Sequence, residues 1–137
     1  KEFTEGSFCE IYSDSYVTNS KVKRVLLCSG KVYYDLLEKQ QADKRKDVAI
    51  IRIEQLYPFP MNQIDEAMKK FKDVEICWVQ EEPSNMGYWA YILRTVTSKG
   101  SIKLISRKAS ASPATGYMKV HKAEQEALVE KAFNLEA

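Results

Sequence analysis

The sequence predicts an α/β domain, a three-layer sandwich in which a mainly parallel sheet carries helices on both faces. Short apolar segments alternate four times with longer segments whose apolar residues recur at helical spacing. The short segments lack the polar–apolar alternation of a strand with one wet face, so both faces of the sheet should be covered. With 137 residues, 45% of them hydrophobic, the chain fits one compact domain that buries roughly two-thirds of its unfolded surface.

Residues 1–20 mix aromatic residues with Ser, Asp, Asn and Gly, and show little periodicity beyond a short strand near Phe8–Tyr12. We interpret them as a linker or leader from an upstream domain. Regular structure should begin with the apolar strand Val25–Cys28, which Ser29-Gly30 closes. A helix that reaches Ala42 follows directly.

The second strand–helix unit begins with the β-branched run Val48–Ile53. After it, Pro58 and Pro60 hold their neighbours in extended geometry and make a stiff connector. Apolar residues at helical spacing then predict a helix from Met61 to Phe71, with Pro60 at a position where a first-turn proline is tolerated.

The third unit is a strand over Ile76–Val79 and a helix over Trp89–Val96. The fourth is a strand over Ile102–Ile105 and a last helix that reaches Phe133, with the loop 107–116 between them. The regular domain therefore spans residues 21–137, and its strand–helix order favours right-handed parallel crossovers.

Composition excludes several classes of protein. The 21 basic residues almost balance the 19 acidic ones, and the net charge of +2 provides no broad field for nucleic acid or an anionic membrane. No apolar stretch approaches the roughly 18 residues that span a bilayer. The three cysteines, Cys9, Cys28 and Cys77, lack CxxC spacing and indicate reduced thiols and a soluble protein of a reducing compartment.

Four phrases resemble the thiamine-dependent 2-oxoglutarate dehydrogenase family. They are RVLLCSGKVYYDL at 24–36, IRIEQLYPFP at 51–60, WVQEEPSNMG at 78–87 and ASASPATG at 109–116, the last followed by His121 and Gln125. The resemblance runs from about Lys21 to the end of the chain. The sequence departs from the family at Ser106 and Lys108, where Gly and Pro are expected.

The resemblance implies a transketolase-type carboxy-terminal domain, the last of three α/β domains in the first, decarboxylating component of the complex. Such a parent chain decarboxylates 2-oxoglutarate oxidatively and transfers succinyl to lipoamide in the tricarboxylic acid cycle. Thiamine diphosphate and Mg²⁺ belong between the two preceding domains, so no catalytic or cofactor-binding residue is carried over to this chain. The implied partners are those upstream domains, a second copy in a homodimer and the dihydrolipoyl succinyltransferase. The implied location is the bacterial cytoplasm or the mitochondrial matrix.

Ser29-Gly30-Lys31 lies where a buried strand meets a helix N-terminus, a place where backbone N–H groups and the helix dipole favour an anion. Some relatives bind a nucleotide effector, AMP or acetyl-CoA, in this domain. On that resemblance Lys31, Arg52 and Arg107 are candidate phosphate ligands. The alternative is an ordinary strand-to-helix turn with Ser29 as the cap.

Glu81 and Glu82 are neighbours at a strand end, so they point to opposite faces and are poorly placed to act as a catalytic pair. We expect them, with Ser110 and Ser112 of the small-residue loop, to orient the next helix or to contact neighbouring domains. A single histidine, His121, with no nucleophile elbow or metal-ligand spacing, disfavours hydrolase and zinc chemistry.

Four aromatic residues allow two interpretations. Trp78, Tyr88, Trp89 and Tyr91 can anchor an interface, although their phasing favours core packing. Two further functions stay open beside the leading one: a free-standing nucleotide-binding module that uses the 29–31 turn, and the same domain in a 2-oxoadipate dehydrogenase. The substrate pocket of the family does not lie in this stretch, so the sequence does not separate the two substrates.

Overall fold

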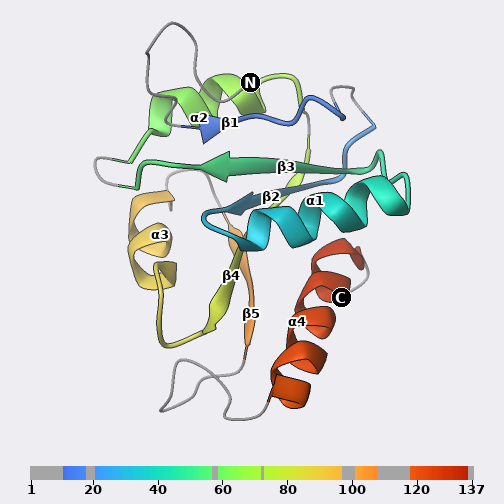
Figure 1. Cartoon of the computed structure of the whole chain (residues 1–137). Coiled ribbons are helices and arrows are strands. Elements are labelled where there is room, and N and C mark those ends of the chain that lie inside the picture. The colour runs from blue at the N-terminus through green and yellow to red at the C-terminus, as the bar shows by residue number, and fades with distance from the viewer. Residues whose placement is uncertain are drawn as a thin grey trace, which may run out of the picture.

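The computed structural model of the protein describes residues 11–17, 21–56, 59–71, 73–96, 101–107 and 118–135. In these residues one sheet has helices on both faces (Figure 1). The strands are β1 (Ile11–Tyr12), β2 (Arg24–Cys28), β3 (Val48–Ile53), β4 (Glu75–Pro83) and β5 (Ile102–Arg107). The helices are α1 (Val32–Ala42), α2 (Met61–Met68), α3 (Trp89–Val96) and α4 (Met118–Phe133).

The sheet has the strand order β1-β3-β2-β4-β5, and all neighbours are parallel except β1, which pairs antiparallel with β3. From the central strand β2 the chain first adds β3 on one side and then crosses to add β4 on the other. The carboxyl ends of β2, β3 and β4 lie together, since Cys28 is level with Arg52 and with Val79. This confirms the predicted mainly parallel α/β sandwich and places its topological switch point between β2 and β4.

The hydrophobic core has one part on each face of the sheet. On one face Leu27 and Trp78 pack with Ile64 of α2 and with Ile92 of α3. On the other face the core of β2 and β4 packs with residues of α1 and α4: Leu26, Cys28, Val32, Leu36, Cys77, Val79, Leu128, Ala132 and Phe133. Every residue of β2 is buried, as expected for a strand covered on both sides.

Arg24 opens β2 and is fully buried. Its Nε donates to Glu75 Oε1 at 2.6 Å, and its Nη1 donates to the carbonyl oxygens of Lys131 and Ala132 at 3.1 and 2.9 Å. Those carbonyls belong to the last turn of α4, where the helix dipole is negative and the i+4 donors are missing; the Lys131 carbonyl also accepts from the N–H of Asn134 at 3.3 Å. A cation from the first parallel strand therefore caps the last helix.

Asp14 holds the segment before the first parallel strand against the sheet. Its Oδ1 accepts from the backbone N–H groups of Tyr16 and Val17, and its Oδ2 accepts from Gln40 Nε2 and the N–H of Ile50, all at 2.7–2.8 Å. Charge-assisted hydrogen bonds of this kind compensate the burial of a carboxylate. Residues 11–17 thus pack with the domain, while the role of residues 1–20 as a connection to an upstream domain stays a prediction.

The observed elements differ from the expected ones mainly at their ends. α2 ends at Met68 rather than at Phe71, and Phe71 lies in the core behind a hydrogen bond from its N–H to the Met68 carbonyl. β4 continues to Pro83, past the expected end at Val79, and pairs with β5 across an irregularity. The strand can extend through polar residues because the buried Gln80 side chain forms its hydrogen bonds inside the protein.

Candidate functional site

The predicted anion-binding turn lies at the carboxyl edge of the sheet, beside the switch point between β2 and β4. Gly30 has φ +80°, and a Cβ there would meet nothing within 4 Å. α1 begins after Lys31, its N-cap residue, without a side-chain cap, so Ser29 does not cap the helix. The Lys31 side chain is 79% exposed, with its Nζ 3.6 Å from Glu81 Oε1.

A polar network joins this turn to α4, and we call it the carboxyl-edge network. Gln125 lies at its centre, where its Nε2 donates to Glu81 Oε1 and Asp35 Oδ2, both at 2.9 Å. The Gln125 Oε1 accepts from Arg107 Nη2 at 2.8 Å. The members of the network are Lys31, Asp35, Glu81, Arg107, His121, Glu124 and Gln125.

Arg107 ends β5, and only 6% of its side chain is exposed. Its Nη1 donates to Glu124 Oε1 at 3.1 Å and lies 3.1 Å from His121 Nδ1. Because a guanidinium only donates, His121 Nδ1 is the acceptor in that contact. Three residues of α4 therefore hold Arg107, and it is far less accessible to a ligand than Lys31 is.

Arg52, another predicted phosphate ligand, lies level with Cys28 and is surrounded by aromatic rings. Its guanidinium carbon lies 5.1–5.4 Å from the ring centroids of Tyr12, Tyr33 and Tyr34, and Arg52 also pairs with Glu54. Burial is the main cause that raises the pKa of the Tyr33 hydroxyl. The structure thus brings Lys31 and Arg107 into one network and places Arg52 in a separate cluster.

The residues predicted to form an interface do not lie together either. Glu81 faces the carboxyl-edge network, whereas Glu82 is exposed, so the two carboxylates do not share a site. Ser110 and Ser112 lie outside the described residues. The sequence interpretation missed Glu124 and Gln125 as partners of Arg107, although their i, i+3 and i+4 spacing from His121 places all three on one face of α4.

The Gln80 side chain fixes the backbone conformation of the segment from Trp78 to Gly87. The buried Gln80 side chain accepts from Trp78 Nε1 at 2.9 Å and donates to the carbonyls of Glu82, Pro83 and Met86. Gly87 closes the loop with φ +73°, and a Cβ there would lie 3.1 Å from Gln80 Oε1. A buried amide therefore organises the connection between β4 and α3.

The two described cysteines are free and buried in the α1/α4 core. Burial raises the pKa of the Cys28 thiol to about 12 and that of Cys77 to about 11. Thiols with so little thiolate are poor nucleophiles and poor metal ligands.

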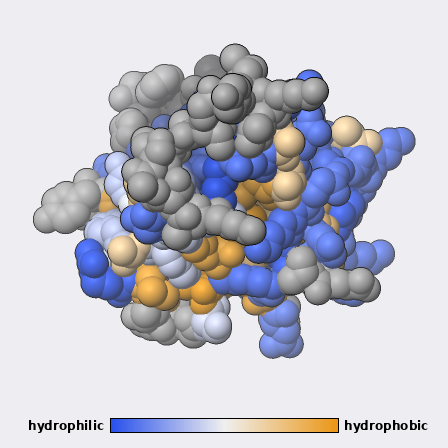
Figure 2. Space-filling view, turned by 90° about the horizontal axis from the view of Figure 1, so that it is seen from below, coloured by the Kyte–Doolittle hydropathy of each residue, from blue (hydrophilic) through white to orange (hydrophobic). Residues whose placement is uncertain are grey.

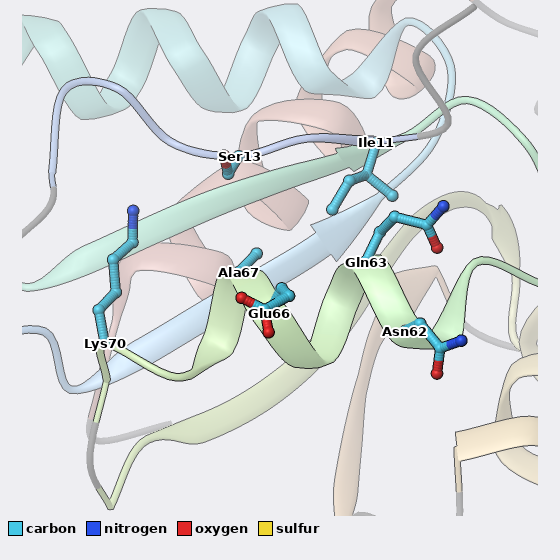
Figure 3. Close-up of a pocket in the computed structure, with 7 residues that line it drawn as sticks. All are labelled: Ile11, Ser13, Asn62, Gln63, Glu66, Ala67 and Lys70. Atoms are coloured by element: carbon cyan, nitrogen blue, oxygen red, sulfur yellow. The ribbon is translucent and has the colours of Figure 1, made fainter.

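Two hollows are alternative candidate sites, and the first shares Asp35 and Gln125 with the network. One of about 590 Å³ separates α1 from α4, and its lining carries five carboxylates but only two ammonium groups, which disfavours a phosphate there. Another, of about 500 Å³, lies between β1 and α2 (Figure 3). Its polar side chains do not converge on one point, since Asn62 lies in the first turn of α2 and Lys70 lies beyond the other end of the helix.

The parts of the chain that the structure describes lack two kinds of feature. There, no group of three or more His, Cys, Asp or Glu side chains is arranged to hold a metal ion. Of the helices described, none has the length and apolar character that crossing a membrane requires.

Comparison with known proteins gives one family over almost the whole chain. A family model described as "2-oxoglutarate dehydrogenase C-terminal" matches residues 1–133. The 2-oxoglutarate dehydrogenase E1 component of Haemophilus influenzae is 45% identical over 140 aligned residues, which cover 97% of this chain and 15% of that protein. A multifunctional 2-oxoglutarate metabolism enzyme from a Mycobacterium species is 40% identical, with 97% and 11% covered. The chain thus spans about 15% or less of these relatives.

A solved structure supports the architecture. The chain described as "Split gene transketolase, inactive beta4 tetramer" superposes with a TM-score of 0.62 at 12% identity, covering all of this chain and 46% of that one. At that identity the likeness concerns the fold, which is transketolase C-terminal-like. The mainly parallel sheet agrees with the expectation from the sequence, whereas the strand order and the antiparallel edge strand were not predicted.

Proposed function

Since this chain belongs to the 2-oxoglutarate dehydrogenase C-terminal family, we propose that it is the carboxy-terminal domain of an E1 component that oxidatively decarboxylates 2-oxoglutarate and passes succinyl to lipoamide. The observation that carries the proposal is the family match over residues 1–133, on a chain that spans only 15% of the Haemophilus influenzae relative. The domain serves as scaffold and assembly surface, and the chemistry belongs to the rest of the parent chain.

The polar groups of the domain support this division. Arg107 contacts His121, Glu124 and Gln125, so these polar groups of the carboxyl edge fasten β5 to α4. A catalytic group has to reach a substrate atom within hydrogen-bonding distance. We therefore assign no step of the reaction to a residue of this chain.

Thiamine diphosphate and Mg²⁺ are the cofactors that the proposal implies for the parent chain. Mg²⁺ is held by carboxylate and other oxygen ligands with near-octahedral geometry. In the described residues no group of three or more His, Cys, Asp or Glu side chains is arranged to hold a metal ion, and we assign Mg²⁺ with thiamine diphosphate to the upstream domains. The partners are then the upstream domains, the second subunit of a homodimer and the succinyltransferase, in a bacterial cytoplasm or a mitochondrial matrix.

The test compares the parent chain with the 137-residue chain. Reconstituted with its acyltransferase and lipoamide dehydrogenase in the presence of CoA, which accepts the succinyl group, the parent should reduce NAD⁺ when 2-oxoglutarate is added. The 137-residue chain should release no CO₂. A preference for 2-oxoadipate would support the sister dehydrogenase instead. Release of CO₂ by the 137 residues alone would overturn the scaffold role.

We also propose that the 29–31 turn binds the phosphate of a nucleotide effector. The supporting observation is Lys31, which is exposed beside an open glycine turn at the N-terminus of an 11-residue helix. An arriving phosphate has to compete with Glu81 for the Lys31 ammonium group. Arg107 lies further back, where its contacts to α4 limit it to a supporting charge.

Titration with AMP and with acetyl-CoA, followed by amide NMR, tests the effector site. We expect shifts at Ser29–Lys31, tighter binding by Glu81→Gln and weaker binding by Lys31→Ala, since each changes one charge beside the turn. Lys122→Ala, on the exposed face of α4, is the matched control. Unmoved amides at the turn would exclude the site, whereas tight binding by a chain with no parent would support the free-standing module.

A further inference from the structure

The two faces of the sheet are covered to different extents. Among the described residues, three partly buried hydrophobic side chains pack against the α1/α4 core, whereas thirteen pack against the α2/α3 core. The partly buried residues at the α2/α3 core lie on helices and also on strands. Those on strands include Ile76, Ile102 and Leu104. Apolar sheet positions that stay partly exposed indicate a face that the described residues do not close.

The helices explain the difference. On the closed face α1 has 11 residues and α4 has 16, and Lys39–Glu130 at 2.6 Å and Asp35–Gln125 at 2.9 Å tie them together. On the other face α2 and α3 have 8 residues each. A groove of about 310 Å³ opens on this face, and its lining is mostly apolar: Leu27, Ile64, Asp65, Met68, Lys69, Ile76 and Val96.

The apolar surface continues onto α3 and the residue before it. Leu93 is 42% exposed and Tyr88 is 52% exposed, although both are large hydrophobic side chains. In the view from below, hydrophobic residues gather left of centre, on the side where α3 lies, and the right-hand side, where α4 lies, is hydrophilic (Figure 2). The groove and α3 together form what we call the α2/α3 face.

The relatives indicate what covers this face. This chain spans 15% of the Haemophilus influenzae relative and 11% of the Mycobacterium one. Most of such a polypeptide lies elsewhere and offers folded surfaces at a high effective concentration, because they are joined covalently to this domain. Interfaces within a chain are built from apolar patches with a polar rim, and Asp65 and Lys69 supply charged groups beside the groove.

We propose that the α2/α3 face docks against another folded domain of the same polypeptide, outside residues 1–137, and that Leu93, Tyr88 and Met68 are its apolar contacts. The proposal rests on the proposed function in so far as it requires a longer parent chain. A second copy of this domain would need the same face to be self-complementary, and that arrangement is an outcome of the test.

Photo-crosslinking in the full parent chain tests the contact. Leu93→p-benzoylphenylalanine places the probe on the α2/α3 face, and Ala127→p-benzoylphenylalanine places it on the exposed side of α4 as the matched control. Protein grown as a mixture of ¹⁵N and ¹⁴N chains separates crosslinks within one chain from crosslinks between two. We expect Leu93 to crosslink to a peptide outside residues 1–137 of its own chain, well above the Ala127 yield.

A yield equal to that of the Ala127 control would overturn the proposal, and so would crosslinks that join two chains. A second measurement is hydrogen exchange in the parent chain. Leu93→Glu should speed exchange of the α3 amides by about tenfold or more, and Ala127→Glu should leave α3 unchanged. Equal exchange in both variants would also count against docking. Neither readout depends on turnover, so a parent that fails to decarboxylate 2-oxoglutarate yet crosslinks at Leu93 would refute the proposed function alone.

Discussion

At the level of single residues, Gly87 and Gly30 have similar backbone conformations but differ in the space available for a side chain. Both have positive φ, +73° and +80°, but a Cβ at Gly87 would lie 3.1–3.2 Å from Gln80 and Glu82, and one at Gly30 would meet nothing within 4 Å. Left-handed backbone costs an L-residue roughly 1–2 kcal/mol. We expect Gly30→Ala to lose about that much unfolding free energy and Gly87→Ala clearly more. Urea unfolding measures both, and equal losses would mean that Gln80 yields without cost.

Cys28 and Cys77 should be unreactive in the folded protein. Burial raises their pKa values to about 12 and about 11, from about 9, so native thiolate is scarce at neutral pH. In a Cys9→Ser background we expect no reaction with Ellman's reagent until urea unfolds the chain. Rapid reaction without denaturant would contradict the burial of both thiols.

The same thiols give a pH dependence of stability. In the unfolded chain they ionise near pH 9, while the folded chain keeps their protons until about pH 11–12. Their contribution is therefore complete below pH 9 and is lost as the pH rises through that window. The unfolding free energy should fall less between pH 8 and 10 when Cys28 and Cys77 are both replaced by Ala in the Cys9→Ser background.

Single residues also mark the limit of what the sequence reveals. The burial of Cys28 and Cys77 could be predicted, because both lie in apolar runs. The roles of Asp14 and Gln80 could not be predicted. Asp14 forms hydrogen bonds with atoms distant along the chain, and Gln80 forms them with a loop whose path the sequence does not specify. The same holds for Gln125, which meets Asp35 across 90 positions of sequence.

Among the structural elements, the segment 11–17 depends on one carboxylate. Asp14 accepts four hydrogen bonds, and its amide analogue cannot accept at both ends of the side chain. Asp14→Asn should cost about 2–4 kcal/mol of unfolding free energy, because it leaves buried donors unpaired. Ser15→Ala, at the exposed neighbouring position, should be neutral. Thermal unfolding of both variants decides, and a neutral Asp14→Asn would exclude the anchor.

The contact of α4 with the sheet depends on Gln125. Gln125→Leu removes the acceptor of Arg107 Nη2 and the donor to Asp35 and Glu81. We expect a loss of roughly 1–3 kcal/mol, with faster hydrogen exchange in the first half of α4. The matched control is Glu126→Leu, at an exposed position of the same helix. If the two variants exchange alike, the network does not fasten α4.

The type and order of the elements could be predicted because apolar runs and helical spacing follow directly from burial on both faces. α3 was predicted with the observed bounds, Trp89–Val96. The extension of β4 to Pro83 could not be foreseen, because Gln80, Glu81 and Glu82 read as the start of a loop. Tertiary hydrogen bonds to Gln80 outweigh that local polarity.

In the molecule as a whole, stability should decrease from the central strand outward. β2 is buried throughout and has parallel neighbours on both sides, whereas α2 is an 8-residue helix on the less covered face. Amides of Val25–Leu27 should therefore exchange only through global unfolding, and those of α2 through local opening. Hydrogen exchange with mass spectrometry measures the order. Protection of α2 equal to that of β2 would contradict it.

The capping of α4 by Arg24 has a consequence for synthesis on the ribosome. Arg24 emerges before the last helix, yet two of its acceptors are the carbonyls of Lys131 and Ala132, 107 and 108 positions later. Until Lys131 and Ala132 leave the exit tunnel, their carbonyls cannot accept hydrogen bonds from Arg24. Burial of the Arg24 guanidinium before that point would cost several kcal/mol of free energy. The nascent chain should consequently complete its central strand only after translation of the last helix has finished.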